Sequence, residues 1–245
     1  MASITEIAAD VYRVSIYSVP ARIQFNHFLV RDEEPLLVHA GLRTMFPDLR
    51  DAVARLLEPS RLRYVACSHF ESDECGGLPL WAAAAPRHEV LCSDLGALVN
   101  LHDFLDRPAR GLADGDVVAT GRYRFRFCRT PHLPHGWDAG LFFEETRRTL
   151  FCSDLFHQNG DVEPLVSADV VGRSRQSLLE AQKGLLAEYV PYTPLTGTQL
   201  DGLAALQPAT LAVTHGSSVS GDGTRAVLAL KAALAEVYGA AGRRP

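Results

Sequence analysis

Strand-like and helix-like segments alternate along most of this chain, and that order limits the fold more than any other feature of the sequence. Short runs rich in β-branched and aromatic residues predict strands over 11–16, 25–31, 35–41, 61–67, 89–93, 117–120, 123–129, 140–145, 148–154 and 209–215. Apolar residues at helical spacing predict helices over 46–59, 78–85, 93–106 and 174–190, near Thr198 and over 223–238. We therefore predict an α/β fold, one domain over residues 1–245, with two sheets between helical layers.

Residues that favour helix ends support three of these helices. Pro47 suits the first turn of the 46–59 helix, and Pro59 would end it. Ser93 is placed to cap the 93–106 helix. Ser177 and Glu180 have the spacing of a capping box in the 174–190 helix.

Charge and apolar patterning argue against two classes of partner. The formal net charge is −5 and the basic residues are scattered, so the chain offers no basic field to nucleic acid or to an acidic membrane surface. No apolar run approaches the roughly 18 residues of a membrane span, and residues 1–10 do not resemble a signal peptide. Five cysteines without a CxxC pair favour reduced thiols. These features predict a cytoplasmic protein.

Histidines and carboxylates follow four of the predicted strands directly. They are His69, Glu71 and Asp73 after 61–67; His132 and His135 after 123–129; Asp154 at the end of 148–154; and His215 after 209–214. Ligand sites of α/β folds lie where the carboxyl ends of strands meet, so these groups are expected to converge.

The donor types and spacing favour two metal ions. Residues two apart in an extended loop point to one side, so the His-x-Glu-x-Asp pattern of residues 69–73 can direct three donors to one point. Asp154 is the natural bridge, because a carboxylate has two oxygens. A nitrogen and oxygen donor set suits iron or manganese as readily as zinc. The alternative is that the acidic stretch is a solvated turn, His215 a core histidine and Asp154 a helix cap.

Four short segments together resemble a known family. They are "HFESDE" (69–74), "PHLPHGWD" (131–138), "CSDLF" (152–156) and "VTHGS" (213–217). They are similar to the metallo-β-lactamase fold, and most similar to its flavodiiron proteins and stand-alone oxygen-binding di-iron proteins. Glu71 stands where the general signature H-x-H-x-D-H has its second histidine. Eighteen residues separate His135 from Asp154, and sixty separate Asp154 from His215.

The resemblance implies an αββα sandwich with a di-iron site. One iron would be held by His69, Glu71 and His135. The other would be held by Asp73 and His215, and Asp154 would bridge the two. His157 and Phe156, close to the bridging residue, are expected to line the pocket.

This sequence departs from the family pattern at Glu74, at His39 and in where it ends. Glu74 stands where the family has a histidine, so it either ligates the second metal or is a hydrogen-bond partner that leaves that metal more open. His39 stands where the family has an aspartate that supports the metal loop from behind, and it could take that role. His132 competes with His135, or could fill the vacancy at Glu74. The chain also ends about thirty residues after His215, which leaves no room for the family's flavodoxin domain.

Three functions follow from these expectations. The first is a di-iron oxidoreductase that binds and reduces dioxygen or nitric oxide, with electrons from a separate donor protein. The second is an oxygen sensor that signals to a partner protein. The third is a two-metal zinc hydrolase. A homodimer is expected from the resemblance alone.

Overall fold

The strands form two mixed sheets that pack face to face. The computed structural model describes residues 2–167 and 170–239. In spatial order, the first sheet contains β1 (Ser3–Ala8), β2 (Val11–Ser18), β3 (Ile23–Val30), β4 (Leu36–Val38), β5 (Tyr64–Ala66), β6 (Glu89–Ser93) and β7 (Arg110–Leu112). The second contains β12 (Leu165–Val166), β14 (Ser218–Ser220), β13 (Thr210–Ala212), β11 (Thr149–Phe151), β10 (Gly140–Glu144), β9 (Arg124–Arg129) and β8 (Val117–Ala119).

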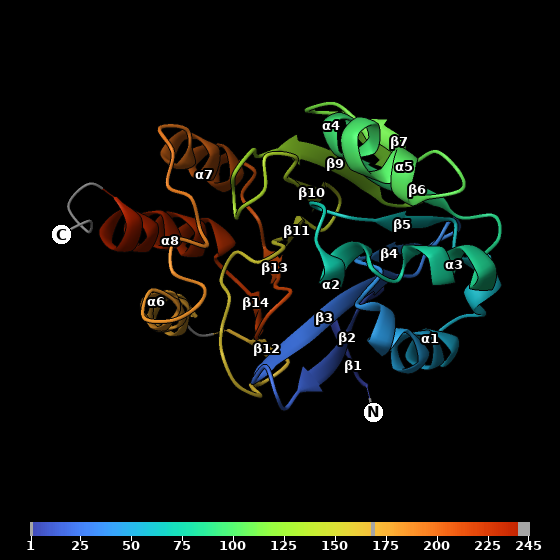
Figure 1. The fold of residues 1–245 in the computed structure, drawn as a ribbon, viewed down its shortest axis with the longest axis horizontal. Helices are drawn as coiled ribbons and strands as arrows, with labels where there is room; N and C mark the ends of the chain where they lie inside the picture. The colour runs from blue at the N-terminus through green and yellow to red at the C-terminus, as the bar shows by residue number, and fades with distance from the viewer. Residues whose placement is uncertain (1, 168–169, 240–245) are drawn as a thin grey trace.

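Helices cover the outer face of each sheet (Figure 1). Over the first sheet are α1 (Phe46–Ala54), α2 (Ser72–Cys75), α3 (Leu78–Ala84) and a continuous helical stretch of α4 (Asp94–Gly96), a π-helical turn (Ala97–Leu101) and α5 (His102–Phe104). Over the second are α6 (Val171–Ala181), α7 (Thr196–Ala205) and α8 (Gly223–Tyr238). The predicted layers, two sheets between helices, are therefore confirmed.

Side-chain alternation along the strands separates three apolar layers. On β4, Leu37 packs with the α1 and α3 side, whereas Val38 faces the second sheet. Phenylalanines fill much of the space between the sheets, where Phe28 from β3 meets Phe151 from β11 with ring centroids 5.8 Å apart. A third layer joins β10, β11 and β13 to α6, α7 and α8.

Most predicted elements are present, and the differences lie at ends and edges. Pro47 is in the first turn of α1, but this helix ends at Ala54 rather than at Pro59. The Ser93 side chain accepts a hydrogen bond from the Gly96 N–H, which confirms that cap. Short strands that the sequence did not predict are β1, β7, β12 and β14.

The predicted helix over 174–190 is wrong at both ends. Helix α6 begins at Val171 and ends at Ala181, and turns follow it. The proposed capping box is also wrong, because Ser177 lies inside the helix and donates to the Arg173 carbonyl. Gly184 weakens a continued helix, and Leu185 beyond it is fully exposed rather than buried on an apolar face.

Candidate metal centre

The predicted donors lie on loops at one edge of the sandwich. Parallel pairing of β4 with β5, and of β11 with β13, brings the carboxyl ends of these strands together. His69 follows β5, Asp154 follows β11 and His215 follows β13, while His135 lies between β9 and β10. Four segments far apart in sequence therefore converge on one place.

Gly77 allows the segment after β5 to pack closely on the loop after β4. A Cβ atom on Gly77 would lie only 2.3 Å from the Ala40 carbonyl oxygen. The same carbonyl accepts a hydrogen bond from the Trp81 indole N–H at 3.0 Å, and the Ala40 N–H donates to the Glu74 carbonyl at 2.7 Å. The start of α2, which carries Asp73, is therefore fixed in place.

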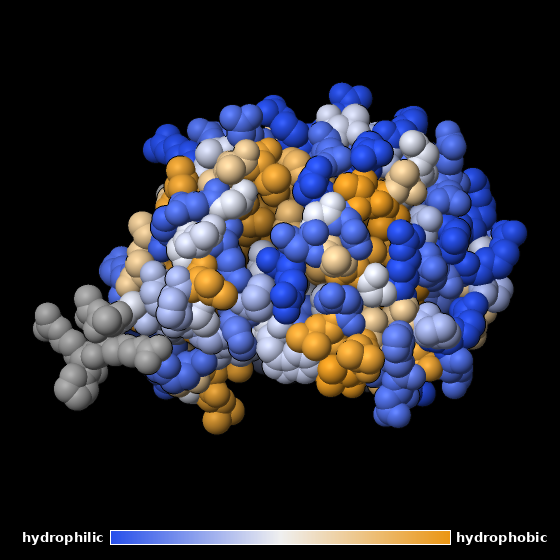
Figure 2. All heavy atoms as spheres, turned by 90° about the horizontal axis from the view of Figure 1, so that it is seen from above, coloured by the Kyte–Doolittle hydropathy of each residue, from blue (hydrophilic) through white to orange (hydrophobic). Residues whose placement is uncertain are grey.

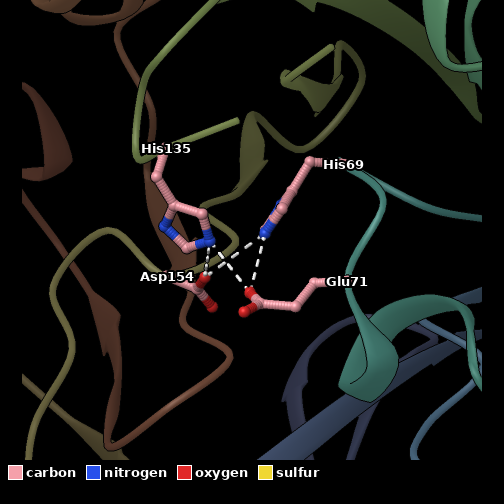
Figure 3. Close-up of side chains that lie close together, drawn as sticks. All are labelled: His69, Glu71, His135 and Asp154. Carbon is pink, nitrogen blue, oxygen red and sulfur yellow. Dashed lines mark hydrogen bonds and ion pairs between the residues drawn. The ribbon is translucent and has the colours of Figure 1, made fainter. Parts of the chain in front are cut away.

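Four side chains form the first donor group, which we call the four-donor group: His69, Glu71, His135 and Asp154. Figure 3 shows these side chains pointing toward one another. His69 Nε2 lies 3.1 Å and His135 Nε2 2.9 Å from Glu71 Oε2. Asp154 Oδ2 lies 3.7 Å from His69 Nε2 and 3.4 Å from His135 Nε2. Two nitrogens and two carboxylates thus surround one point.

Three side chains form the second group, the three-donor group: Asp73, Asp154 and His215. His215 Nε2 lies 3.2 Å from Asp73 Oδ2 and 3.1 Å from Asp154 Oδ1. Asp154 thus turns one oxygen to each group, the geometry of a bridging carboxylate. His215 Nδ1 lies 2.8 Å from the Gln24 carbonyl and donates to it, which leaves Nε2 free to bind a metal.

Electrostatics hold the cluster together in the metal-free protein. Burial disfavours a charged His69, but Glu74, Asp154 and Glu71 outweigh burial and raise its pKa well above 6.5. Burial is likewise outweighed at His215, whose pKa is raised by Asp154 and Asp73. Hydrogen bonds from His135 and His69 lower the pKa of Glu71 to about 2. Protons on His69 and His215 therefore balance part of the carboxylate charge when no cation is bound.

Glu74, His39 and His132 all lie outside the two donor groups. Glu74 is fully buried behind His69 and belongs to neither donor group. His39 is buried beside it, with Nε2 3.1 Å from Glu74 Oε1. His132 also belongs to neither group, and its backbone has a φ of 65°. His157 borders the cavity described next, whereas Phe156 packs in the core.

Tyr189 is a site residue that the sequence did not predict. Its hydroxyl donates to Asp154 Oδ2 at 3.3 Å and lies 3.2 Å from His135 Nε2. Burial and the charges of Asp154, Glu71 and Asp73 raise the pKa of this phenol, so it stays protonated. The break in the helical pattern at Gly184 was the one available sign that the residues after it form a loop over the site.

A cavity of about 430 Å³ opens beside Asp154 and Tyr189. Its lining is mostly apolar and includes Leu178, Ala181, Leu186 and Val190. Apolar side chains are also exposed on the loops that carry His69 and His135, where Phe70 and Trp137 are each 41% exposed. Figure 2 shows that, on the face seen from above, apolar side chains gather in separate clusters on a largely hydrophilic surface.

The donor set fits two metal ions. It consists of imidazole nitrogens and carboxylate oxygens, which suit iron, manganese or zinc. Asp154 Oδ1 is buried and accepts no hydrogen bond from the described residues, although His215 Nε2 is 3.1 Å away. A cation between these two atoms would satisfy both.

Solved structures of flavodiiron proteins share this fold. The rubredoxin oxygen:oxidoreductase from Desulfovibrio gigas superposes with a TM-score of 0.80 at 20% identity, over 94% of this chain and 61% of that one. The flavodiiron protein from Giardia intestinalis superposes with a TM-score of 0.74 at 18% identity, over 96% of this chain and 58% of that one.

Curated relatives give the same indication at the level of sequence. The rubredoxin-oxygen oxidoreductase of Megalodesulfovibrio gigas is 24% identical over 200 residues, which are 80% of this chain and 49% of the relative. The nitric oxide reductase of Moorella thermoacetica is 25% identical over 196 residues, 78% of this chain and 48% of the relative. The chain thus spans about half the length of these relatives. Residues 23–216 match the family described as "ODP family beta lactamase", and the chain belongs to that family.

Proposed function

We propose that this protein binds two iron ions and uses them to bind and reduce dioxygen or nitric oxide. The observation that carries the proposal is the position of Asp154, which directs Oδ2 to the four-donor group and Oδ1 to the three-donor group. The six proposed ligands are His69, Glu71, Asp73, His135, Asp154 and His215. Zinc or manganese would fit the same donors.

The relatives support the redox chemistry over hydrolysis. Two of them are named for oxygen and nitric oxide reduction. When bound, two ferrous ions supply electrons to a diatomic molecule that reaches both of them. No comparison supports the zinc hydrolase alternative.

The chain's own residues would position the ligand. Tyr189 remains a neutral phenol 3.3 Å from Asp154 Oδ2, so its Oη can donate a hydrogen bond to a molecule held between the two groups. The apolar cavity beside it admits an uncharged diatomic and limits the water around the site.

Electron supply and assembly are further parts of the proposal. The described residues 2–167 and 170–239 form the sandwich and carry the site. We propose that a separate donor protein supplies the electrons, with a sensor that has no turnover as the second possibility. The exposed Phe70 and Trp137 flank the donors and offer an apolar contact for such a partner. A homodimer, a cytoplasmic location and a single domain over 1–245 stay predictions. Among the described helices, none has both the length and the apolar character needed to cross a bilayer.

Anaerobic iron loading tests the proposal directly. We expect two Fe²⁺ per chain and a change in the visible spectrum when air or nitric oxide is admitted. Asp154→Asn should lose both the bound iron and the spectral change. Asp222→Asn, at the distant N-cap of α8, should keep both. Two bound irons with no spectral response would contradict the redox function. Hydrolysis of an ester or phosphodiester by a zinc-only sample would favour the hydrolase instead.

A further inference from the structure

The Glu74 carboxylate accepts so many hydrogen bonds from Ser68, His69 and Ser153 that it cannot also reach a metal. Its carboxylate accepts from the Ser68 N–H at 2.9 Å and the His69 N–H at 3.1 Å. The Ser68 hydroxyl lies 2.7 Å from both of its oxygens, and the Ser153 hydroxyl donates to Oε1 at 2.8 Å. These donors use the roughly four acceptor positions that a carboxylate has.

The same contacts determine which nitrogen of His69 carries a proton. Ser68 has one hydroxyl proton, which it donates in a hydrogen bond to the Glu74 carboxylate. Ser68 Oγ, 3.0 Å from His69 Nδ1, is therefore left to accept a hydrogen bond from that nitrogen. Nδ1 therefore keeps its proton when Nε2 gives up its own, and the Nε2 lone pair then faces Glu71 and Asp154, as a metal ligand requires.

His39 stabilises Glu74 from the other side. The exposed fractions of the two side chains are 1% and 0%, and a buried carboxylate is costly unless polar groups surround it. His39 Nδ1 also lies 3.3 Å from the Thr214 hydroxyl, next to His215. Its backbone has a φ of 69°, a conformation that a histidine keeps only where the surroundings enforce it.

We infer that Glu74, paired with His39, is a positioning residue for His69 and that it makes the two metal positions unequal. The four-donor position fills first and holds its metal more tightly. The three-donor position, to which Glu74 does not contribute, fills second and keeps the more open coordination. This inference rests on the proposed two-metal centre.

Stepwise metal binding tests the inference on metal-free protein, with Co²⁺ as the probe. We expect two separate binding steps in the visible spectrum, the tighter one weakened by His135→Gln and the weaker one by Asp73→Asn. Glu74→Gln removes the charge but keeps the shape, and its NH2 group replaces one acceptor oxygen with a donor that competes with His69 Nδ1 for Ser68 Oγ. It should weaken the tighter step by roughly 10- to 100-fold and leave the weaker step within about threefold.

Glu144→Gln is the matched control. Glu144 is equally buried, but it holds the turn between β10 and β11 through the Thr146 and Arg147 N–H groups. It should lower the unfolding temperature of the metal-free protein without changing either binding step.

Several outcomes would overturn the inference. One is equal weakening of both steps by Glu74→Gln, as a purely structural lesion gives, and another is uptake of both ions in one step by the wild-type protein. A metal-loaded crystal with a Glu74 oxygen bound to an ion would also contradict it. No Co²⁺ binding by the wild-type protein would instead contradict the two-metal centre itself.

Discussion

Two segments border the same site but are held in opposite ways. In residues 67–77, Ser68, His69 and Glu74 are buried, and backbone groups bond to β6 and to Gly41 as well as to Glu74. In residues 182–190, the backbone N–H groups of Lys183, Gly184, Ala187 and Tyr189 bond only to nearby carbonyls, and Leu185 and Leu186 are exposed. The first arrangement suits fixed ligands, and the second suits access to the site and a hydrogen-bond donor beside it.

The largest expected effect is on metal affinity in the fixed segment. His69→Ala should reduce affinity at the four-donor position by more than the roughly 100-fold that losing an outer partner can cost, because a direct donor is lost. Leu185→Ser in the second segment should change it by less than about twofold. Chelator competition measures both. Equal losses in the two variants would end the distinction between the segments.

The buried pair behind the fixed segment should dominate its stability. His39→Leu replaces the imidazole that lies 3.1 Å from Glu74 Oε1 with an apolar side chain, and we expect a loss of about 3 kcal/mol in the free energy of unfolding of the metal-free protein. Adding Glu74→Gln removes the unpaired charge and should restore at least about 1 kcal/mol of it. Urea unfolding of the two single variants and the double variant measures this coupling. Strict additivity would show that the pair is not coupled.

The metal-free and metal-loaded proteins should respond to pH in opposite directions. The raised pKa values of His69 and His215 stabilise the metal-free fold fully below 6.5, and this stability is lost as pH rises through the raised values. Glu71 contributes above pH 4.5, and that stability is lost as pH falls toward its pKa of about 2. Metal binding displaces the imidazole protons, so affinity should rise by about tenfold per pH unit for each proton released.

Urea unfolding and chelator competition between pH 5 and 8 check both trends. Leu185→Ser should keep the wild-type profile, because residue 185 adds no titratable group to the site. Metal-free stability that rises steadily from pH 6.5 to 8 would contradict the assignment of protons to His69 and His215.

A smaller effect is expected from the hydroxyl that the second segment supplies. Tyr189→Phe should leave metal affinity within about twofold but slow the reaction of the iron-loaded protein with dioxygen by roughly tenfold, the value of one hydrogen bond of about 1.4 kcal/mol. Stopped-flow absorbance measures the rate. Tyr192→Phe is the control, because residue 192 lies two positions beyond the segment and, among the described residues, makes no hydrogen bond to the donors. A fall in metal content would place Tyr189 in the ligand-holding machinery instead.

The two segments also differ in how far the sequence predicted them. In residues 67–77, strong local rules apply: a buried strand ends, and donors at alternate positions follow it. The role of Glu74 stayed open, because a carboxylate can ligate a metal or accept hydrogen bonds and the sequence does not give its direction. Tyr189 was missed because Leu185 and Leu186 continue the apolar pattern of α6, although both are exposed. Tertiary packing, rather than the local apolar pattern, determines that α6 ends at Ala181 and that the residues after it leave the helix.

The smallest expected effect concerns the cavity under the second segment. Ala181 lies at the last position of α6 and lines the cavity beside Asp154, so a bulky side chain there occupies the space through which a diatomic would approach. Ala181→Trp should slow oxygen binding by roughly three- to tenfold while two irons remain bound. Ala187→Trp, which is exposed and does not line the cavity, should leave the rate unchanged. If both variants react at the wild-type rate, dioxygen reaches the metals from the Phe70 and Trp137 side, and the loosely held segment contributes only the Tyr189 hydroxyl.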